Sequence, residues 1–239
     1  MPWTFAGLTD QGRVRPKNED ALLINPERQL FAVADGLGGL PRGSLASSLA
    51  VDHLNALVMR DPAEQSADLN RIFLEVNRLV CSKGFEISEE TGIGTTLTAV
   101  QINDDRLTIG HAGDSALIAF RTDGWDQLTS DHTMAEEIRS RLKPGEDAYI
   151  PDYFHHTLTR CIGQTDELDI DTEEHIWRSG ERFLICSDGV TKVFEPDELQ
   201  AAIFEKSDPE ELVHWIIDTG NERGGPDNIT AIVLFPPDA

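Results

Sequence analysis

The chain has 239 residues, 39% of them hydrophobic, which is the composition of an ordinary soluble globular protein. Asp and Glu number 43 against 20 Lys and Arg, and the resulting formal net charge of −23 argues against nucleic acid and anionic membranes as partners. The three cysteines form no C-x-x-C motif, and no apolar run approaches the roughly 18 residues of a membrane span. Since no linker or repeat divides the chain, we expect one cytoplasmic domain over residues 1–239.

The first third of the chain predicts three strands followed by two helices. Runs rich in β-branched and aromatic residues at 3–8, 21–24 and 30–34 are bounded by turn residues, which is typical of strands. Apolar residues then recur at helical spacing over 46–58 and over 69–80, which predicts two helices with one buried face each.

The rest of the chain predicts a group of strands, an irregular segment and one further helix. The predicted strands are 95–102, 106–111, 116–121, 182–186 and 229–235. Short polar turns join the first three of them, which favours antiparallel pairing and a layered α+β fold over a doubly wound parallel sheet. Residues 131–160 show no regular period, so we expect an irregular surface segment. Later, Asp208 and Pro209 have the form of a helix start, with Glu211 reaching back.

Aspartates stand beside the ends of four apolar runs, usually next to a glycine. They are Asp35, Asp114, Asp188 and Asp227. A single Asp-Gly pair most often marks a tight turn, but Asp35-Gly36 leads into further glycines and a helix. Carboxylates gathered on one rim would repel each other, and divalent cations relieve that repulsion by taking several oxygens each. The pattern therefore predicts a site for Mg²⁺ or Mn²⁺, with the Gly36 carbonyl able to approach the ion.

A mixed basic and acidic segment near the N-terminus adds candidate residues. Arg15 could bind a phosphate through two hydrogen bonds. Glu19 and Asp20 could hydrogen-bond the waters of a bound metal ion. Viewed alone, the segment is more typical of a solvated surface turn than of a binding site.

Six motifs in order resemble those of the metal-dependent Ser/Thr protein phosphatases of type 2C, the PPM family, in its compact bacterial form. The resemblance runs from about residue 7 to residue 235, which is nearly the whole chain. Each motif alone is weak, and their order and rough spacing make the signal strong. They are Gly12-Arg-Val-Arg15 with Asn18-Glu19-Asp20, Val33-Ala-Asp35-Gly36-Leu-Gly38-Gly39, Gly94-Thr95-Thr96, Gly113-Asp114-Ser115, Ser187-Asp188-Gly189 and Gly225-Pro-Asp227-Asn228-Ile-Thr230.

The resemblance implies an α+β fold, namely an α-β-β-α sandwich with two central antiparallel sheets flanked by helices. It also implies a dinuclear Mg²⁺ or Mn²⁺ site between the sheets. Carried over by position, Asp35 would bridge the two ions and Gly36 would give its carbonyl to one of them. Asp188 and Asp227 would hold the other ion. Asp114, together with Asp188, would form a third, weaker site.

Further positions would complete the site around the ions. By the same resemblance, Arg15 would clamp the substrate phosphate, and residues 131–160 fall where the family has a variable flap beside the active site. Glu19, Asp20 and Asn228 would support the metal-bound waters.

Two positions depart from the pattern of the family. Some members carry a histidine, assigned as the general acid, where this chain has Leu37, so a metal-bound water would have to protonate the leaving group. Many members carry an arginine where this chain has Ala116, which weakens the support for the third ion but not for the paired site.

The resemblance implies hydrolysis of phosphoserine and phosphothreonine in other proteins by a metal-activated water. The residues that would carry catalysis are Arg15, Asp35, Asp188 and Asp227. The substrates would be phosphorylated proteins made by a Ser/Thr kinase, and the cysteines would be structural. Two alternatives stay open: a pseudophosphatase that binds without turnover, and a metal-dependent phosphoesterase for a small molecule, which a deep enclosed pocket would favour.

Overall fold

The computed structural model describes residues 2–40, 42–60, 67–143, 145–165 and 167–237. Its centre is a pair of five-stranded sheets, and the neighbouring strands within each sheet run antiparallel. The first sheet consists, in order, of β1 (Thr4–Asp10), β10 (Ile229–Phe235), β9 (Arg182–Cys186), β6 (Ala116–Arg121) and β7 (Gly124–Gln127). The second sheet consists of β2 (Asp20–Asn25), β3 (Leu30–Asp35), β4 (Leu97–Asn103), β5 (Arg106–Ala112) and β8 (Asp171–Ile176).

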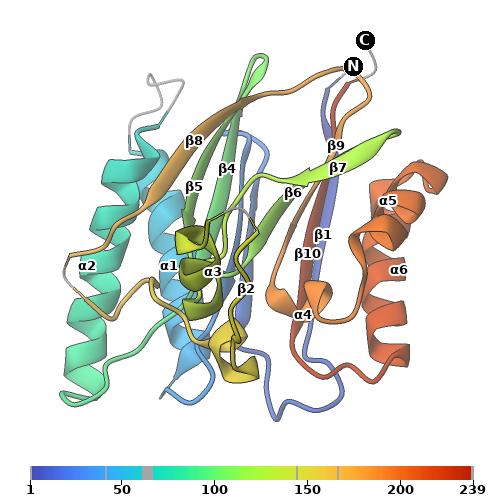
Figure 1. Ribbon diagram of the computed structural model, residues 1–239. Coiled ribbons are helices and arrows are strands. Elements are labelled where there is room, and N and C mark those ends of the chain that lie inside the picture. Colours follow the sequence, from blue (N-terminus) through green and yellow to red (C-terminus); the bar gives the residue numbers. More distant parts are fainter. Residues whose placement is uncertain (1, 41, 61–66, 144, 166, 238–239) are drawn as a thin grey trace.

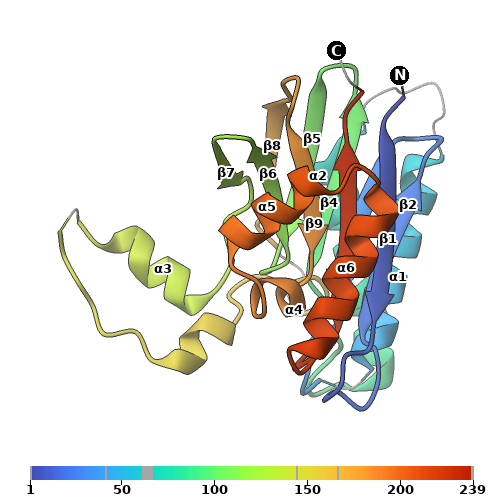
Figure 2. The ribbon, with the colours of Figure 1, turned by 90° about the vertical axis from the view of Figure 1, so that its right-hand side faces the viewer.

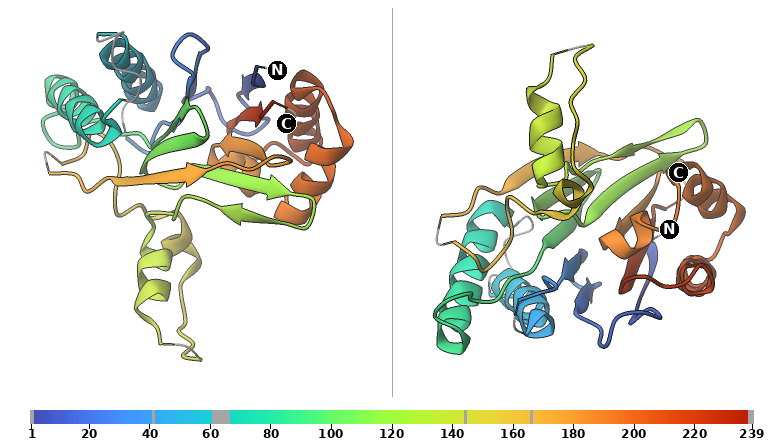
Figure 3. Two further views of the ribbon diagram at one scale, coloured as in Figure 1. Left: turned by 90° about the horizontal axis from the view of Figure 1, so that it is seen from above. Right: turned by 60° about the horizontal axis from the view of Figure 1, so that its bottom comes forward.

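Helices cover the outer face of each sheet, as Figure 1 and the view from above in Figure 3 show. The helices α1 (Gly43–Val58) and α2 (Leu69–Ile87) lie on the second sheet, whereas α5 (Pro196–Glu205) and α6 (Pro209–Glu222) lie on the first. The order of the layers is α-β-β-α, which confirms the predicted fold. Among the described residues, the helices are all too short or too polar to cross a membrane.

Both faces of the central strands are buried, and their alternating side chains divide between two cores. In β3, Phe31 and Val33 pack in the layer between the sheets. Leu30, Ala32 and Ala34 pack instead with residues of α1 and α2. Burying a large apolar side chain contributes about 1.5–3 kcal/mol, and a slip by one residue would exchange the two faces. The alternation thus fixes the register of the strands, and with it the positions of the charged residues at their ends.

The described residues of the segment 131–160, namely 131–143 and 145–160, include a part that projects away from the sandwich, at the left of Figure 2. The prediction of an irregular segment is wrong in part, because the structure contains the helix α3 (Met134–Arg141) and the 3-10 helix η1 (Asp152–His156). Thr133 caps α3 by accepting a hydrogen bond of 3.2 Å from a backbone N–H of the first turn. Ala135 is the buried residue of α3, so the sequence offers no apolar stripe from which the helix could be predicted.

The start of α6 agrees with the prediction in one respect and differs in another. The side chain of Asp208 caps the helix by accepting a hydrogen bond of 2.9 Å from the Glu210 N–H. Glu211, expected to reach back to the cap, instead lies 3.0 Å from Lys206 Nζ in an ion pair. The lysine at the end of α5 therefore competes successfully for this carboxylate.

Candidate active site

The four aspartates beside the apolar strands meet in one pocket. One of them, Asp188, is the first residue of α4 (Asp188–Thr191), which lies at the end of the sandwich opposite the chain termini in Figure 1. The second sheet contributes Asp35 at the end of β3, and Asp114 lies in the turn between β5 and β6. The first sheet contributes Asp188 after β9 and Asp227 before β10. The pocket has a volume of about 260 Å³ and is lined by Arg15, Glu19, Asp35, Gly36, Leu37, Gly38, Thr96, Asp114, His156, Leu158, Asp188, Lys192, Asp227 and Asn228.

Threonines hold the backbone of Asp35 on both sides. The Asp35 N–H donates to Thr96 Oγ1 at 2.9 Å, and the Asp35 carbonyl accepts from Thr95 Oγ1 and from the Thr96 N–H, each at 2.8 Å. Thr96 is tied in turn to Ser115 by a hydroxyl–hydroxyl bond of 2.6 Å. The Gly-Thr-Thr motif therefore fixes Asp35, and Ser115 links it to the turn that carries Asp114.

Gly36 lies where backbone segments pack too closely for a side chain. A Cβ at this position would lie 2.4 Å from the carbonyl oxygen of Gly43 and 2.6 Å from that of Glu19. The Gly36 N–H donates to the Glu19 carbonyl at 3.1 Å. Packing alone thus requires a glycine here, while the use of its carbonyl as a metal ligand stays a prediction.

Asp20 joins the two sheets beside the pocket. It lies opposite Asp35 in the register of β2 and β3. Its Oδ2 accepts hydrogen bonds from Ser187 Oγ at 2.8 Å and from Thr230 Oγ1 at 2.6 Å. Ser187 directly follows β9 and Thr230 lies in β10, so both hydroxyls lie close to Asp188 and Asp227. A buried carboxylate of one sheet therefore positions the acidic end of the other.

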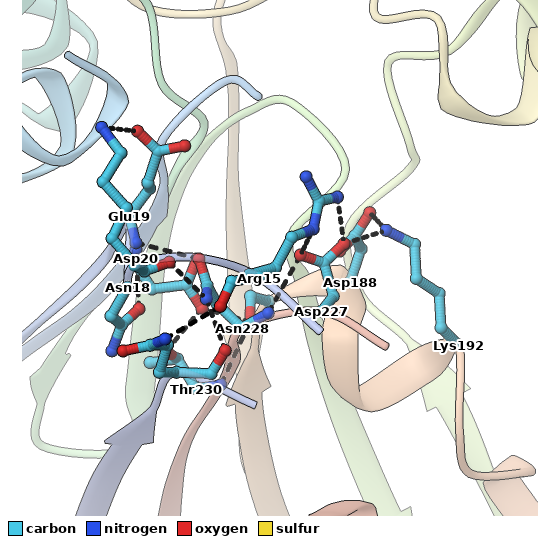
Figure 4. Close-up of polar contacts among 12 residues, drawn as sticks. Arg15, Asn18, Glu19, Asp20, Asp188, Lys192, Asp227, Asn228 and Thr230 are labelled. Atoms are coloured by element: carbon cyan, nitrogen blue, oxygen red, sulfur yellow. Dashed lines mark hydrogen bonds and ion pairs between the residues drawn. The ribbon is translucent and has the colours of Figure 1, made fainter. Parts of the chain in front are cut away.

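Asn228 holds the loop that carries Arg15 (Figure 4). Its Oδ1 accepts from the Glu19 N–H at 2.9 Å, and its Nδ2 donates to the carbonyls of Gln11 at 2.8 Å and Lys17 at 3.0 Å. The carboxylate of Glu19 lines the pocket and pairs with Lys17 at 2.8 Å. The contacts of these residues with metal-bound waters stay predictions.

Two basic side chains bind Asp227, as the dashed lines of Figure 4 show. Arg15 makes a two-pronged contact, with Nε 2.8 Å from Oδ1 and Nη2 2.9 Å from Oδ2. Lys192 Nζ lies 2.7 Å from Asp227 Oδ2 and 2.5 Å from Asp188 Oδ2. Sequence reasoning places Arg15 at the site but misses Lys192. The available signal was the i,i+4 spacing from Asp188, because α4 (Asp188–Thr191) brings both side chains to one face.

The surroundings shift the pKa values of the carboxylates in different directions. Burial, reinforced by repulsion from neighbouring aspartates, raises the pKa of Asp35 well above its ordinary value and that of Asp114 to about 7. Burial also raises the pKa of Asp20, to about 6. For Asp227, burial works in the same direction, but the two basic side chains bound to it outweigh burial and lower its pKa. Burial and mutual repulsion thus oppose the ionisation of Asp20, Asp35 and Asp114, and added positive charge would favour it.

The turn that carries Asp114 is tied to the projecting segment 131–160. Gly113 has a left-handed φ of 122°, and a Cβ there would lie 2.5 Å from a neighbouring side chain. Its N–H donates to His132 Nδ1 at 3.1 Å, and His132 Nε2 donates to Asp171 Oδ2 at 3.0 Å. His132 is a second residue that sequence reasoning misses, since it reaches Gly113 only when the chain folds back.

The two positions that depart from the family pattern have different surroundings. Leu37 lines the pocket, whereas Ala116 is 2% exposed and lies opposite Cys186 in the first sheet. The three cysteines are buried free thiols. Burial raises the pKa of Cys161 and of Cys186 to about 12, so neither supplies a thiolate nucleophile at neutral pH.

The donor set around the pocket fits a hard divalent cation. In the part of the chain that the structure describes, no three acidic, histidine or cysteine side chains are already grouped as ligands of one ion, and Lys192 bridges Asp188 and Asp227 instead. Asp188 Oδ1 is nevertheless buried without a hydrogen-bond partner. An unsatisfied carboxylate oxygen beside further carboxylates is the kind of ligand that Mg²⁺ and Mn²⁺ prefer.

Comparison with known proteins gives consistent similarities. The family described as protein phosphatase 2C matches residues 13–216. The serine/threonine phosphatase stp of Listeria innocua is 30% identical over 238 residues, which cover 95% of this chain and 93% of that protein. Among solved structures, PppA, a regulatory component of the T6SS in Pseudomonas aeruginosa, has a TM-score of 0.84 at 30% identity over 99% of both chains. The catalytic domain of the phosphatase PstP, in complex with two manganese ions, has a TM-score of 0.83 at 29% identity over 99% of both chains.

Proposed function

The chain belongs to the protein phosphatase 2C family, and from this premise we propose that it removes phosphate from serine and threonine side chains of other proteins. The observation that carries the proposal is the meeting of Asp35, Asp188 and Asp227 in one pocket. These residues come from two sheets and lie far apart along the chain. A solvated acidic surface would not explain why they meet in one pocket.

A dinuclear centre of Mn²⁺ or Mg²⁺ would be held in this pocket. Asp35 would bridge the ions, with the Gly36 carbonyl as a further ligand. Asp188 and Asp227 would bind the second ion, and Asp114 with Asp188 would bind a third more weakly. Cations bound in this way lower the pKa of a coordinated water and neutralise charge on phosphoryl oxygens. The unpartnered Oδ1 of Asp188 supports the assignment, and so does the relative that carries two manganese ions.

The residues of the chain itself would bind and orient the substrate. The side chain of Arg15 is 43% exposed and lines the pocket. Its guanidinium can therefore exchange Asp227 for a phosphate, which matches its pair of parallel N–H donors. Leu37 has no proton to give, so water in the pocket would protonate the leaving serine or threonine. Asn228 and Asp20 would keep the Arg15 loop and the two sheets in position.

A second pocket supports a protein rather than a small molecule as the substrate. It has a volume of about 690 Å³ and is lined by the loop after β3, by the segment 131–160 and by residues that follow it. The two pockets share Leu37, Gly38, His156 and Leu158. A phosphorylated residue in the first pocket would thus leave room beside it for its neighbours in a peptide. In this proposal, 131–160 is the flap of a single catalytic domain over residues 1–239.

The proposed cellular setting is the cytoplasm, opposite a Ser/Thr kinase. The three free thiols fit a reducing compartment. The net charge of −23 fits a protein that acts on other proteins rather than on nucleic acid or at an anionic membrane.

Hydrolysis of a phosphothreonine peptide tests the proposal. Wild-type protein should release phosphate with Mn²⁺ and lose this activity in EDTA, and Asp35→Asn should lower kcat/KM by orders of magnitude. Asp52→Asn, a matched change at an exposed position of α1, should retain activity. Equal turnover in chelator would contradict the mechanism. Mn²⁺ binding without hydrolysis would indicate a pseudophosphatase, and turnover of small phosphate esters alone would indicate the small-molecule alternative.

A further inference from the structure

Lys192 bridges the two aspartates that the proposed function assigns to one cation (Figure 4). Its Nζ lies 2.5 Å from Asp188 Oδ2 and 2.7 Å from Asp227 Oδ2. We infer that Lys192 is an intrinsic cation, which holds this pair of carboxylates together in the metal-free protein and competes with a divalent ion for them. The inference rests on the proposed function, because it concerns the same pocket.

The local fold gives the Lys192 backbone little freedom to lie elsewhere. Its N–H donates to the Asp188 carbonyl at 2.8 Å, so the lysine stands one helical turn after the aspartate. Gly189 packs against the backbone of Asn228, and a Cβ on this glycine would lie 1.8 Å from the Asn228 carbonyl oxygen. Such close packing fixes α4 against the start of β10. The lysine side chain is 28% exposed, so most of it lies within the protein.

Both oxygens of Asp227 are already engaged while its basic partners are in place. Oδ1 accepts from the Asn228 N–H at 2.9 Å and lies 2.8 Å from Arg15 Nε. Oδ2 lies 2.9 Å from Arg15 Nη2 and 2.7 Å from Lys192 Nζ. Arg15 can exchange Asp227 for a substrate phosphate, whereas Lys192, which directly follows α4, stays beside the carboxylates. A divalent ion at Asp188 and Asp227 must therefore displace the ammonium group, or share the carboxylates with it against charge repulsion.

The opposite wall of the pocket has no such competitor. Within the described ranges, neither Asp35 nor Asp114 forms an ion pair with a basic side chain. A first ion should therefore bind on the Asp35 side without displacing a bound cation. A second ion, on the side of Asp188 and Asp227, should bind more weakly because Lys192 opposes it. The expected result is that the first ion binds with higher affinity than the second.

Calorimetric titration of the metal-free protein with Mn²⁺ alone tests this competition without using activity. In Lys192→Met, the affinity for the second ion, which binds Asp188 and Asp227, should rise about tenfold, which corresponds to about 1.4 kcal/mol. Lys192→Gln removes the charge but keeps a hydrogen-bonding group, and should show the same gain. Lys83→Met removes one positive charge from α2, where Lys83 pairs with Glu86. It controls for the change in net charge and should bind Mn²⁺ as the wild type does.

Unchanged or weaker Mn²⁺ binding in the Lys192 variants would overturn the inference, provided that circular dichroism shows them to be folded. If Lys192→Met does not fold, Lys192→Gln decides alone. If the wild type hydrolyses the peptide with Mn²⁺ but the Lys192 variants bind Mn²⁺ with unaltered affinity, this inference is wrong and the proposed function still holds. A wild type that neither binds Mn²⁺ nor hydrolyses the peptide would reject both.

Discussion

The two walls of the pocket carry the same acidic residue type under opposite electrostatic conditions. On one wall, which we call the uncompensated side, Asp35 and Asp114 line the pocket and Asp20 lies beside Asp35, and among the described residues none of the three forms an ion pair with a basic side chain. On the other wall, the compensated side, Asp188 and Asp227 are bound by a lysine and an arginine. Burial raises the pKa values on the uncompensated side, whereas the pKa of Asp227 is lowered.

This difference shows that the residue type alone does not determine the need for a metal ion. An aspartate with a basic partner is already neutralised, and an ion that binds it must replace that partner. An aspartate that faces only other carboxylates gains from any cation that arrives. A first divalent ion should therefore bind on the uncompensated side. The basic residues of the compensated side then determine the affinity for a second ion.

Asparagine substitutions on the two sides should change the stability of the metal-free protein in opposite directions. Asp35→Asn removes a buried acid whose ionisation is opposed by burial and by neighbouring carboxylates, and should raise the free energy of unfolding by about 1–2 kcal/mol. Asp227→Asn leaves Arg15 and Lys192 without this carboxylate, and should lower it by about 1–3 kcal/mol. Urea unfolding in EDTA, followed by tryptophan fluorescence, measures both changes.

Addition of Mn²⁺ provides the control for these two variants. A ligand at 100 times its Kd stabilises the folded state by about 2.7 kcal/mol. The wild type should gain this amount, and Asp35→Asn should gain much less because it has lost the bridging carboxylate. If both asparagine variants shift the metal-free stability in the same direction, the comparison between the two sides is wrong.

The acids of the pocket could be predicted from the sequence, whereas their basic partners could be predicted only in part. Each aspartate lies beside a buried strand, and antiparallel sheets return strand ends to a common rim. The i,i+4 spacing of Lys192 from Asp188 signals only one of its two contacts, because Asp227 lies 35 residues away and reaches Lys192 only when β9 and β10 pair. The role of His132 could not be predicted for the same reason, because its hydrogen bond to Gly113 depends on how the segment 131–160 folds back.

The fold shows the same dependence on burial. Every residue of β10 is buried, and its apolar run predicts the strand directly. In contrast, β8 is mostly exposed and carries Thr, Glu and His side chains, so it has no apolar signature. Its pairing with β5 at the edge of the sheet gives it an extended conformation. Elements that are stabilised by a neighbour rather than by their own apolar residues are those that sequence reasoning misses.

The pH dependence of stability should sharpen the contrast between the two sides. Asp114 has a pKa of about 7 in the folded protein against an ordinary value of 3.8, so the folded state binds its proton more tightly than the unfolded state. The resulting destabilisation is complete above pH 7 and is relieved as the pH falls toward 3.8. The advantage of Asp114→Asn over the wild type in EDTA should thus shrink by about 1–2 kcal/mol between pH 7 and pH 5.5.

The same measurement on Asp227→Asn is the control for the compensated side. The pKa of Asp227 is lowered, so this group contributes stability that is lost only as the pH falls below its ordinary value. Between pH 7 and pH 5.5, the penalty of Asp227→Asn should therefore stay constant. Parallel curves for both variants would mean that the two walls do not differ in the way described.

Substitution of Arg15 should have the smallest effect of the changes considered, because Arg15 has a binding partner both without and with substrate. In the metal-free protein it pairs with Asp227, and in the proposed complex it would bind the phosphate instead. Arg15→Ala should raise KM for a phosphothreonine peptide about tenfold, or about 1.4 kcal/mol, and leave kcat largely unchanged, since the lost contact would act on bound substrate and transition state alike. Arg15→Lys should recover only part of this loss, because a lysine lacks the paired donors. Arg13→Ala, at an exposed position two residues earlier, controls for the lost charge, and an unchanged KM in Arg15→Ala would exclude the proposed phosphate contact.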